Sequence, residues 1–391
     1  MDIDYLKDLI KIYKPEYIWM PNKRLAELNI HKIKFHSIEY SLVKLSHHDH
    51  YQLHNDLALL LTTSGSTGSP KFVRLSYNNL LANANAIAQF LAITAEERPI
   101  TVLPMHYSFG LSIINSHLIK GATILLTNLS LMEREFWTFL KSYKASSLSG
   151  VPYTYEILKR LRFLSMDLPF LKTLTQAGGE LNIKLTKEFA EYCQFTNKRF
   201  FVMYGQTEAT ARMSYLPYEQ LMTKAGSIGV PIPGGLFHLI DEKGILINET
   251  DKIGELIYYG PNVSMGYAEN GDDLILDDVN KGRLSTGDFA KKDENNYYYI
   301  VGRKNRFIKL FGNRVNLDET ERLLKVLLPD CACIGADDKM VIYINERNRL
   351  DEIKKYVSTK IGINHSAFTV KEIDEIPKNS SGKTLYSKLE L

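Results

Sequence analysis

The strongest constraint on the fold is an alternation of short apolar runs and amphipathic stretches between residues 57 and 203. Strands that alternate with helices predict a mostly parallel sheet covered by helices on both faces, which is an α/β fold. Ser76 is a candidate N-cap for a further helix, because apolar residues recur at helical spacing after it. Strands are expected at 57–62, 100–104, 122–127, 145–149, 171–176 and 199–203, and helices at 111–119, 131–143, 153–163 and 183–194.

Polar loops that contain glycine follow four of the expected strands, at 64–71, 105–110, 177–180 and 204–208. Parallel sheets bind ligands at the carboxyl ends of their strands. We therefore expect these four loops to lie on one rim of the sheet and to form the functional site there.

The pattern of apolar and turn-forming residues changes twice after this region. Residues 226–302 have short β-runs and turns, and the segment after 303 is typical of a compact α+β unit. That unit is expected to contain helices at 317–328 and 350–361 and strands at 331–336, 339–345 and 367–373. We predict an N-terminal domain over 1–303 and a small mobile C-terminal domain over 304–391. Within the N-terminal domain we expect an α/β core over 57–225 and a β-rich subdomain over 226–303. Residues 1–56 are poorly defined apart from a possible helix at 3–13.

Composition argues against several broad classes of function. The 391 residues include 48 basic and 45 acidic side chains, a net charge of +3, with no basic block. We therefore expect neither a nucleic-acid nor a membrane-surface role, and no apolar run approaches the ~20 residues that span a bilayer. The start of the chain has no signal-peptide pattern, and the three cysteines form no disulfide or metal pattern, so a cytoplasmic location is expected.

The segment from Thr62 to Lys71, Thr-Thr-Ser-Gly-Ser-Thr-Gly-Ser-Pro-Lys, is the most informative in the chain. Its glycines let backbone N–H groups turn toward an anion, its hydroxyls add donors, and its lysine supplies a positive charge for a polyphosphate. It does not fit the Walker A pattern, because Pro70 stands five residues after Gly65. A Ser/Gly-rich surface turn is the alternative reading of this segment alone.

Together with further segments, this loop resembles the adenylate-forming superfamily, which includes acyl-CoA synthetases, peptide-synthetase adenylation domains and luciferases. The resemblance covers roughly residues 57–391, and its segments follow the order of the family. They are Ala177-Gly-Gly-Glu180, Tyr204-Gly-Gln-Thr-Glu208, Gly226-Ser-Ile-Gly-Val-Pro231, Gly254-Glu-Leu, Gly266-Tyr267, Ser285-Thr-Gly-Asp288, Gly302-Arg303, Ile308-Lys-Leu-Phe-Gly-Asn-Arg314 and Pro377-Lys-Asn-Ser-Ser-Gly-Lys383.

The resemblance implies ATP as a substrate and assigns roles to individual residues. Thr207 would donate to the α-phosphate, and Glu208 would hold Mg²⁺. Lys383 would bridge the acid's carboxylate and the α-phosphate, and a hinge near 303–306, at Asn305, would move it in and out. The β- and γ-phosphates would be held by Thr63, Ser64, Gly65, Ser66, Thr67, Gly68 and Lys71, and the adenine and ribose by Gly178, Gly179, Glu180, Tyr204, Gly205, Asp288 and Arg303.

The sequence departs from the family pattern in four places. The phosphate loop comes about a hundred residues earlier than usual, so we expect much of the typical N-terminal subdomain to be missing. Phe72 stands where members usually have Gly, and Asn305 replaces the common Asp or Lys of the hinge. The acid-pocket segment has His106, Tyr107, Phe109 and Gly110, and Gly110 stands where enzymes for α-amino acids have Asp.

An unpaired buried ammonium would be costly, so the substrate is expected to be an acid without an α-amino group. The leading hypothesis is activation of a small carboxylic acid as acyl-AMP, with transfer to CoA or to the phosphopantetheine of an acyl carrier protein. Transfer to a non-thiol acceptor, a luciferase-type oxygenation and a catalytically inactive nucleotide-binding scaffold are the alternatives, and the oligomeric state is left open.

Overall fold

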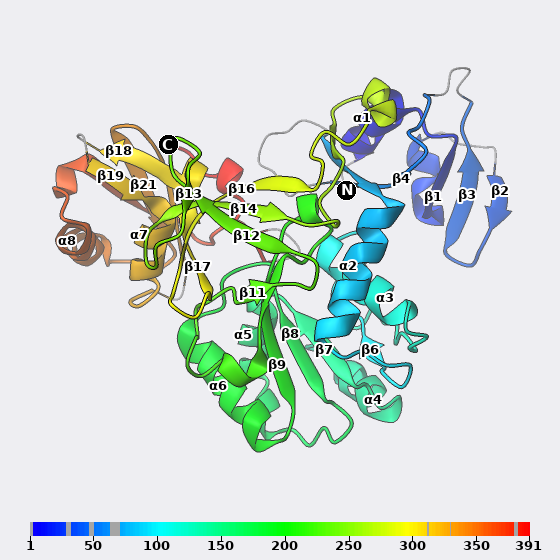
Figure 1. Ribbon diagram of the computed structural model, residues 1–391, viewed down its shortest axis with the longest axis horizontal. Helices are drawn as coiled ribbons and strands as arrows, with labels where there is room; N and C mark the ends of the chain where they lie inside the picture. Colours follow the sequence, from blue (N-terminus) through cyan, green and yellow to red (C-terminus); the bar gives the residue numbers. More distant parts are fainter. Residues whose placement is uncertain are drawn as a thin grey trace.

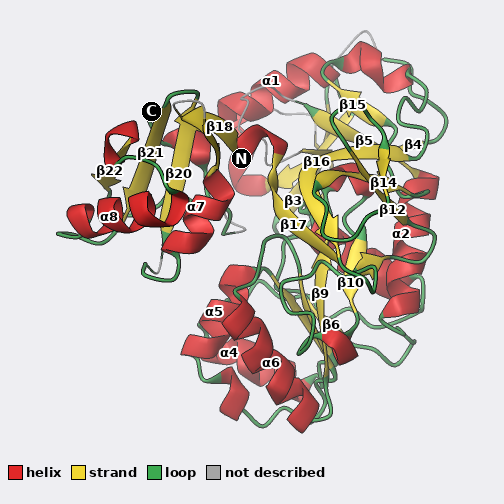
Figure 2. Ribbon diagram, turned by 60° about the vertical axis from the view of Figure 1, so that its left-hand side comes forward, coloured by secondary structure: helices red, strands yellow, loops and turns green. Residues whose placement is uncertain are grey.

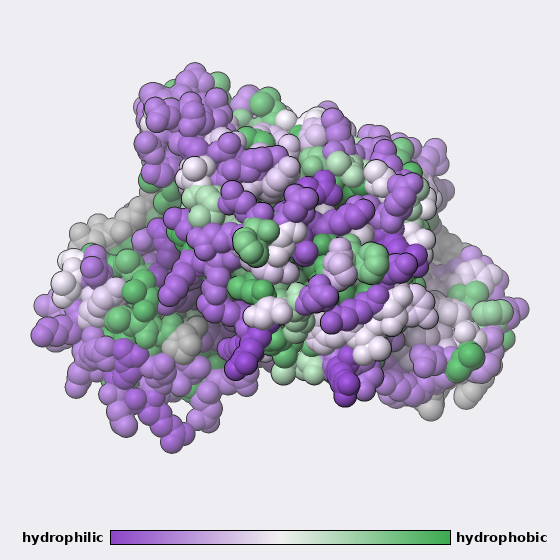
Figure 3. Space-filling view, turned by 90° about the horizontal axis from the view of Figure 1, so that it is seen from below, coloured by the Kyte–Doolittle hydropathy of each residue, from purple (hydrophilic) through white to green (hydrophobic). Residues whose placement is uncertain are grey.

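The structure is a computed structural model that describes residues 3–28, 33–46, 51–62, 71–310, 313–328, 330–378 and 382–391. Figure 1 shows a large N-terminal part, built on several sheets, and a smaller α+β part formed by the end of the chain. Among the described residues, no helix has the length and apolar character that a membrane span requires. Hydrophilic and apolar residues are interspersed on the face seen in Figure 3.

A six-stranded sheet of order β11-β10-β9-β8-β7-β6 is the centre of the α/β core. The strands β6 to β9 are parallel, and β10 and β11 extend the sheet in antiparallel fashion. Their bounds are β6 Pro99–Ile100, β7 Ser147–Gly150, β8 Thr173–Gln176, β9 Arg199–Tyr204, β10 Ser214–Leu216 and β11 Val230–Pro231.

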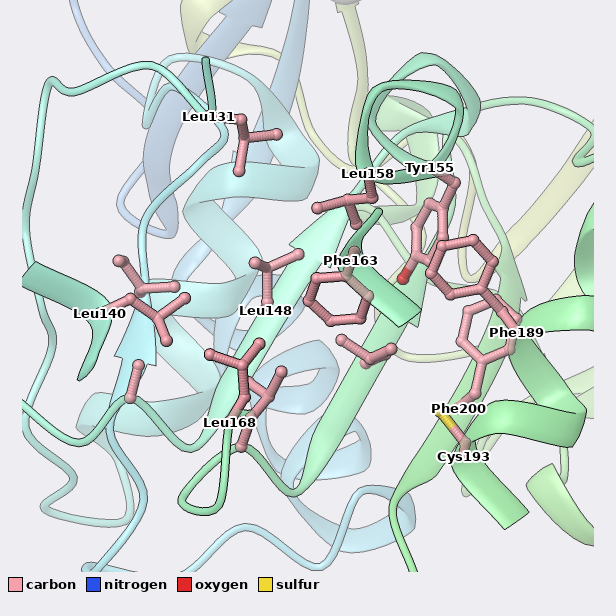
Figure 4. Packing of buried hydrophobic residues seen from close by; sticks show 14 of the residues in the cluster. Leu131, Leu140, Leu148, Tyr155, Leu158, Phe163, Leu168, Phe189, Cys193 and Phe200 are labelled. Carbon is pink, nitrogen blue, oxygen red and sulfur yellow. The ribbon is translucent and has the colours of Figure 1, made fainter. Parts of the chain in front are cut away.

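Successive side chains of a strand point to opposite faces of the sheet, so the two faces of this sheet carry two different rows of side chains. Leu148, Leu174 and Phe200 are register neighbours and belong to an apolar cluster with the helices of one face, part of which is drawn in Figure 4. On the other face Ser149 and Thr175 are followed by Phe201, and α2 and α3 cover this more polar row. Figure 2 places α4, α5 and α6 on one side of the sheet and α2 on the other.

The helices follow from caps and apolar spacing in the sequence. The helix expected after Ser76 is confirmed as α2, and the Ser76 hydroxyl accepts a hydrogen bond from the backbone N–H of Asn79 at 3.0 Å. The covering helices are α2 Tyr77–Phe90, α3 Ser108–Leu118, α4 Arg134–Ser142, α5 Pro152–Arg160 and α6 Ile183–Phe195.

Three of the expected strands are corrected by the structure. Of the strand expected at 100–104, only Ile100 belongs to β6 (Pro99–Ile100). Leu57–Thr62 (β4) is only half-buried and pairs in antiparallel fashion with β5 (Phe72–Ser76), in a separate three-stranded sheet with β15 (Gly266–Ala268). The run at 122–127 forms only an isolated bridge between Ile100 and Leu125. Apolar character alone did not distinguish a strand of the parallel sheet from an antiparallel strand or from a partly buried loop.

The two ends of the chain add further sheets. At the N-terminus α1 (Ile3–Tyr13), which the sequence predicted, precedes a sheet of β1 (Tyr17–Pro21), β3 (Tyr40–Lys44) and β2 (Ile33–His36). The β-rich region is a five-stranded antiparallel sheet of β13 (Leu246–Ile247), β12 (Leu236–Ile240), β14 (Gly254–Tyr259), β16 (Arg283–Lys292) and β17 (Tyr298–Arg303).

The C-terminal part has an apolar core of its own, formed by residues between Ile308 and Val370. The expected helix at 317–328 is shorter, because α7 ends at Leu324. The elements are β18 Phe307–Leu310, β19 Asn313–Asn316, α7 Leu317–Leu324, β20 Cys331–Ala336, β21 Lys339–Ile344, α8 Leu350–Ile361 and β22 Phe368–Glu372.

Arg74 on β5 fixes the small sheet to a distant segment of the chain. Its side chain is fully buried and donates hydrogen bonds to the main-chain carbonyls of Met265 at 3.0 Å, Tyr267 at 3.1 Å and Asp277 at 3.1 Å, and also to that of Leu276. Removing the guanidinium would take one donor from each of these carbonyls, although the Met265 carbonyl would still accept from the backbone N–H of Val279 at 3.1 Å. The loss of several hydrogen bonds from a fully buried side chain is costly.

We expect Arg74→Met to lower the free energy of unfolding by about 2–4 kcal/mol, because four main-chain carbonyls lose a donor at once. Chemical denaturation of the two proteins measures the difference. Arg134→Met, which removes an exposed guanidinium on α4, is the control and should change the stability by less than about 0.5 kcal/mol. Equal stabilities of the two variants would contradict the bracing role of Arg74.

Candidate active site

The carboxyl ends of the parallel strands bring three of the expected loops together. The segment before α3, the turn after β8 and the turn after β9 lie on the same rim, because β7, β8 and β9 run in parallel register. The hydroxyls of Ser108 and Thr207, from two of these segments, are 3.2 Å apart. The residues Thr63, Ser64, Gly65, Ser66, Thr67 and Gly68 lie outside the described part of the chain.

Asp288 on β16 is the centre of a cluster of polar side chains at this rim. It is only 6% exposed, and its carboxylate accepts hydrogen bonds from the Tyr204 hydroxyl and from Gln206 Nε2 at 3.3 Å. Arg303 Nε lies 3.9 Å from Asp288 Oδ1. Burial raises the pKa of Asp288, whereas the Tyr204 hydrogen bond and the Arg303 charge lower it. The cluster therefore offers a hydrogen-bonding carboxylate to a polar group such as a sugar diol.

Glu208 and Lys71 meet around the ring of Tyr267. The Tyr267 hydroxyl donates to Glu208 Oε1 at 2.7 Å, and Lys71 Nζ lies 3.8 Å from the ring centroid. Lys71 Nζ is also 3.5 Å from Glu269 Oε1. Burial and the neighbouring Glu208 raise the pKa of Tyr267, so its hydroxyl keeps its proton and acts as a donor. The three residues place one cation and one carboxylate side by side.

Lys383 reaches the same rim from the C-terminal part. Its Nζ lies 5.7 Å from the ring centroid of Tyr107. The preceding Gly382 has φ +76°, and a Cβ there would lie 2.9 Å from the Cβ of Tyr153 on α5. Burial and the charge of Arg303 lower the pKa of Lys383, while Glu208 raises it. Residues 383, 303 and 208 are therefore close enough to interact electrostatically, although they are far apart in the sequence.

The glycines of the expected nucleotide pocket have clear steric roles. Gly178 has φ +86°, and a Cβ there would lie 2.5 Å from the Tyr107 hydroxyl. At Gly205 a Cβ would lie 1.7 Å from the carbonyl oxygen of Ala211, so the turn after β9 requires glycine. Gly179 adjoins Pro152 on α5. These positions let aromatic and backbone groups approach the rim closely.

Glu180 faces the C-terminal part of the molecule. Its side chain is exposed to solvent, but partial desolvation raises its pKa, and the positive charges of Arg322 and Lys325 near α7 act in the opposite direction. The hinge candidate Asn305 is exposed in a short 3₁₀ helix, Lys304–Arg306, and its neighbour Lys304 pairs with Glu255 at 2.9 Å. Contacts between the two parts of the chain are thus polar in this region.

The expected acid-pocket residues do not share one environment. His106 is exposed, whereas Phe109 is buried in the cluster between α2, α3 and the sheet. A Cβ at Gly110 would lie 2.2 Å from the carbonyl oxygen of Pro104, so glycine permits the close packing of α3 against the preceding turn. Of this group, Tyr107 is the residue that lies beside Lys383.

Sequence reasoning missed several polar side chains at the rim and behind it. Gln206 and Tyr267 were inside quoted segments, but their contacts with Asp288 and Glu208 join residues more than fifty positions apart. The buried Arg212 carried no signal, because a single arginine after the Tyr204–Glu208 segment is indistinguishable from a surface residue in sequence.

Comparison with known proteins identifies relatives along most of the chain. The sequence model of the AMP-binding enzyme family matches residues 22–268. A feruloyl-CoA synthase of Amycolatopsis sp is 28% identical over 351 residues, covering 85% of this chain and 69% of that protein. A long-chain-fatty-acid–CoA ligase of Yersinia pestis is 30% identical over 360 residues, covering 86% of this chain and 62% of that protein.

Solved structures share the fold. The o-succinylbenzoate coenzyme A synthetase of Bacillus subtilis in complex with ATP and magnesium has a TM-score of 0.70 at 24% identity, covering 90% of this chain and 71% of that one. Its complex with an acyl-adenylate intermediate has a TM-score of 0.71 at 25% identity, covering 86% and 69%. The chain belongs to the AMP-binding enzyme family, the adenylate-forming superfamily, and is an ATP-dependent, AMP-forming ligase of the acyl-CoA synthetase type.

Proposed function

We propose that the rim residues and Lys383 form one adenylation site, and that its product passes to a thiol. The observation that carries this proposal is the position of Lys383, which enters the rim beside Tyr107 and within electrostatic reach of Arg303 and Glu208. A carboxylate that approaches a triphosphate meets strong repulsion between like charges. Catalysis must therefore neutralise that charge and align the reactants.

In the first step a carboxylate oxygen of the acid attacks the α-phosphorus of ATP. The bond between the α-phosphorus and the bridging oxygen breaks, and pyrophosphate leaves with the electron pair. The Lys383 ammonium would stabilise the charge that builds up on the α-phosphate, and the Thr207 hydroxyl would donate to it. Asp288 would accept hydrogen bonds from the ribose hydroxyls, with Tyr204 and Gln206 holding its carboxylate in place.

The phosphate end of the nucleotide would lie near Lys71 and Glu208. Mg²⁺ typically uses one or two carboxylates together with substrate phosphates, and Glu208 is a carboxylate of this kind next to a lysine. When bound, Mg²⁺ would shield phosphate charge. Among the described residues there is no cluster of three or more acidic, His or Cys side chains that would form a metal cage without the nucleotide.

In the second step a thiol sulfur attacks the acyl carbon, and AMP leaves as the acyl–oxygen bond breaks. We propose that residues 304–391 move as a unit about Asn305 to withdraw Lys383 before this step. CoA or the phosphopantetheine of an acyl carrier protein would supply the thiol, and the cytoplasm is the proposed location. One solved relative is an adenylation domain joined to a peptidyl carrier protein, with a TM-score of 0.68.

Transfer to a non-thiol acceptor is the second candidate, because the first step does not depend on the acceptor. An inactive scaffold is disfavoured by the convergence of Lys71, Glu208, Asp288 and Lys383 on one rim. Release of pyrophosphate from ATP with a panel of carboxylic acids, followed by addition of CoA or of a loaded carrier protein, separates the three candidates.

Replacement of Lys383 should affect the first step more than nucleotide binding. We expect Lys383→Ala to slow acid-dependent pyrophosphate release by about 100-fold or more, because a preorganised charge at the transition state is lost. The affinity for ATP, measured by calorimetry, should change by less than about tenfold. Lys388→Ala removes an exposed lysine five residues further on and should leave the rate unchanged. A wild-type rate in Lys383→Ala would overturn the assignment.

Tyr267 orients the Glu208 carboxylate in this account. We expect Tyr267→Phe to raise the Mg²⁺ concentration for half-maximal pyrophosphate release by about 10-fold, because a second-layer hydrogen bond to a ligand is lost. The phenyl ring preserves the contact with Lys71. Tyr77→Phe, at an exposed tyrosine on α2, is the control. An unchanged Mg²⁺ dependence in Tyr267→Phe would show that Glu208 does not need this donor.

A rigid residue at the hinge should separate the two steps. We expect Asn305→Pro to retain acyl-AMP formation and to slow thioester formation by about tenfold or more, because proline fixes φ and restricts the preceding residue. Asn305→Ala is the matched control and should keep both rates. Equal slowing of both steps in the proline variant would contradict a hinge at this position.

A further inference from the structure

A network of buried charged side chains lies directly after the proposed hinge. Its centre is Arg306, the residue that follows Asn305, and only 7% of Arg306 is exposed. Arg306 Nε donates to Asp318 Oδ1 at 2.8 Å, and Nη2 donates to Glu321 Oε1 at 2.5 Å. Arg306 Nη1 donates to the carbonyl oxygen of Cys333 on β20 at 2.6 Å. Because both carboxylates belong to α7, the guanidinium joins the residue after the hinge position to α7 and to β20.

An aromatic ring from the end of the chain covers the face of this guanidinium. Arg306 Cζ lies 4.1 Å from the ring centroid of Tyr386. The Tyr386 hydroxyl donates to Glu321 Oε2 at 3.0 Å, so the ring is held both at its face and at its polar end. Burial and the charge of Glu321 raise the pKa of Tyr386, so the hydroxyl keeps its proton and remains a donor. The planar guanidinium of arginine is well suited to such stacking, whereas the ammonium of lysine is not planar.

Tyr386 belongs to the segment that carries Lys383. The two residues are three positions apart, and the backbone N–H of Leu385 between them donates to the carbonyl oxygen of Pro377 at 2.7 Å. Lys383 lies at the rim beside Tyr107. The short stretch from 383 to 386 therefore connects the rim with Arg306.

Apolar contacts already form the core of the C-terminal part without this network. The main apolar cluster extends from Ile308 to Val370, and Tyr386 packs only against the edge of a second, smaller cluster. Buried ion pairs are often replaceable by apolar residues with no loss of stability. A requirement for one fixed geometry therefore explains the charged network at this place better than a contribution to stability does.

We propose that Arg306 and Tyr386 are positioning residues for Lys383: their stacked contact fixes the segment that carries Lys383 to the residue after the hinge position, so that the ammonium enters the rim in one place when the C-terminal part is closed. The inference rests on the proposed adenylation function. Arg306 and Tyr386 act through Lys383 and not on the substrates. A displacement of about 1 Å can cost a reaction about 100-fold in rate, so a loosened segment would slow the first step.

The test is a double-mutant cycle on the first step, with acetate, hexanoate, benzoate and cinnamate as the acids. The acid that gives the fastest pyrophosphate release with the wild type is used for every variant. We expect Tyr386→Ala to lower kcat by at least about tenfold and to change the KM for ATP by less than about threefold. In the Lys383→Ala background the same change should lower kcat by less than about twofold, because a positioning residue acts only through the group that it positions.

Conservative variants separate the stacked contact from the integrity of the fold. Tyr386→Phe retains the ring over Arg306 and should keep kcat within about threefold of the wild type. Arg306→Lys retains the charge but not the planar face, so it should slow the first step as Tyr386→Ala does. The matched control is Tyr356→Ala on α8, which removes a half-buried tyrosine whose ring centroid lies 5.8 Å from Lys360 Nζ. It should keep the wild-type kcat, and thermal unfolding checks that each variant folds.

Hydrogen exchange of the backbone amides gives a readout that needs no substrate. We expect a peptide that covers residues 382–391 to exchange at least about tenfold faster in Tyr386→Ala than in the wild type, because exchange reports local opening of a segment. Tyr386→Phe and Tyr356→Ala should keep the wild-type exchange of this peptide.

The outcomes separate this inference from the function on which it rests. A slow first step in Lys383→Ala together with a wild-type rate in Tyr386→Ala would overturn the positioning role and leave the adenylation function intact. Equal loss from Tyr386→Ala with and without Lys383 would also overturn it, as would unchanged hydrogen exchange in Tyr386→Ala. No pyrophosphate release with any of the acids would overturn the proposed function of the site, and this inference with it.

Discussion

The site depends on bringing the ammonium of Lys383 into a half-buried position between two parts of the chain. Burial disfavours the charged form of a lysine, and the nearby Arg303 adds to this effect. Glu208 offsets it only in part. A triphosphate at the rim would add negative charge around this ammonium, so nucleotide binding and closure of the C-terminal part are expected to favour each other.

The same electrostatic logic extends to the acid. Both substrates of the proposed first reaction are anions, and Lys383 presents a cation at the rim beside Tyr107. The packing of α3 explains why an acidic anchor is absent from position 110, because any Cβ there would collide with the Pro104 carbonyl.

Much of the architecture could be predicted from the sequence, and the exceptions have physical reasons. The alternation of apolar runs predicted β7 to β9 and α3 to α6 with small boundary errors, because each strand is buried on both faces and each helix has an apolar stripe. The predicted pairing of β4 was wrong. β4 pairs in antiparallel fashion with β5, and local apolar character does not determine the partner of a strand. The run at 122–127 is a loop that pairs with β6 only through the bridge between Ile100 and Leu125, and in this loop Ala122 and Leu125 are buried while Leu126 is exposed.

For the site, the motifs indicated which residues matter but not how they are supported. Asp288 and Glu208 were singled out from their segments, whereas the donors that hold them, Gln206 and Tyr267, follow only from three-dimensional contacts. The sequence could not single out Arg212, because the burial of a side chain cannot be inferred from one position in a sequence.

A crystal structure with a non-hydrolysable acyl-adenylate mimic tests the central claim most directly. We expect the ribose hydroxyls to lie at the Asp288 carboxylate and the phosphate analogue to lie within hydrogen-bonding distance of Lys383 Nζ. The acyl group is expected to point toward Tyr107. A mimic bound away from Asp288, or bound at the rim with Lys383 turned to solvent, would contradict it.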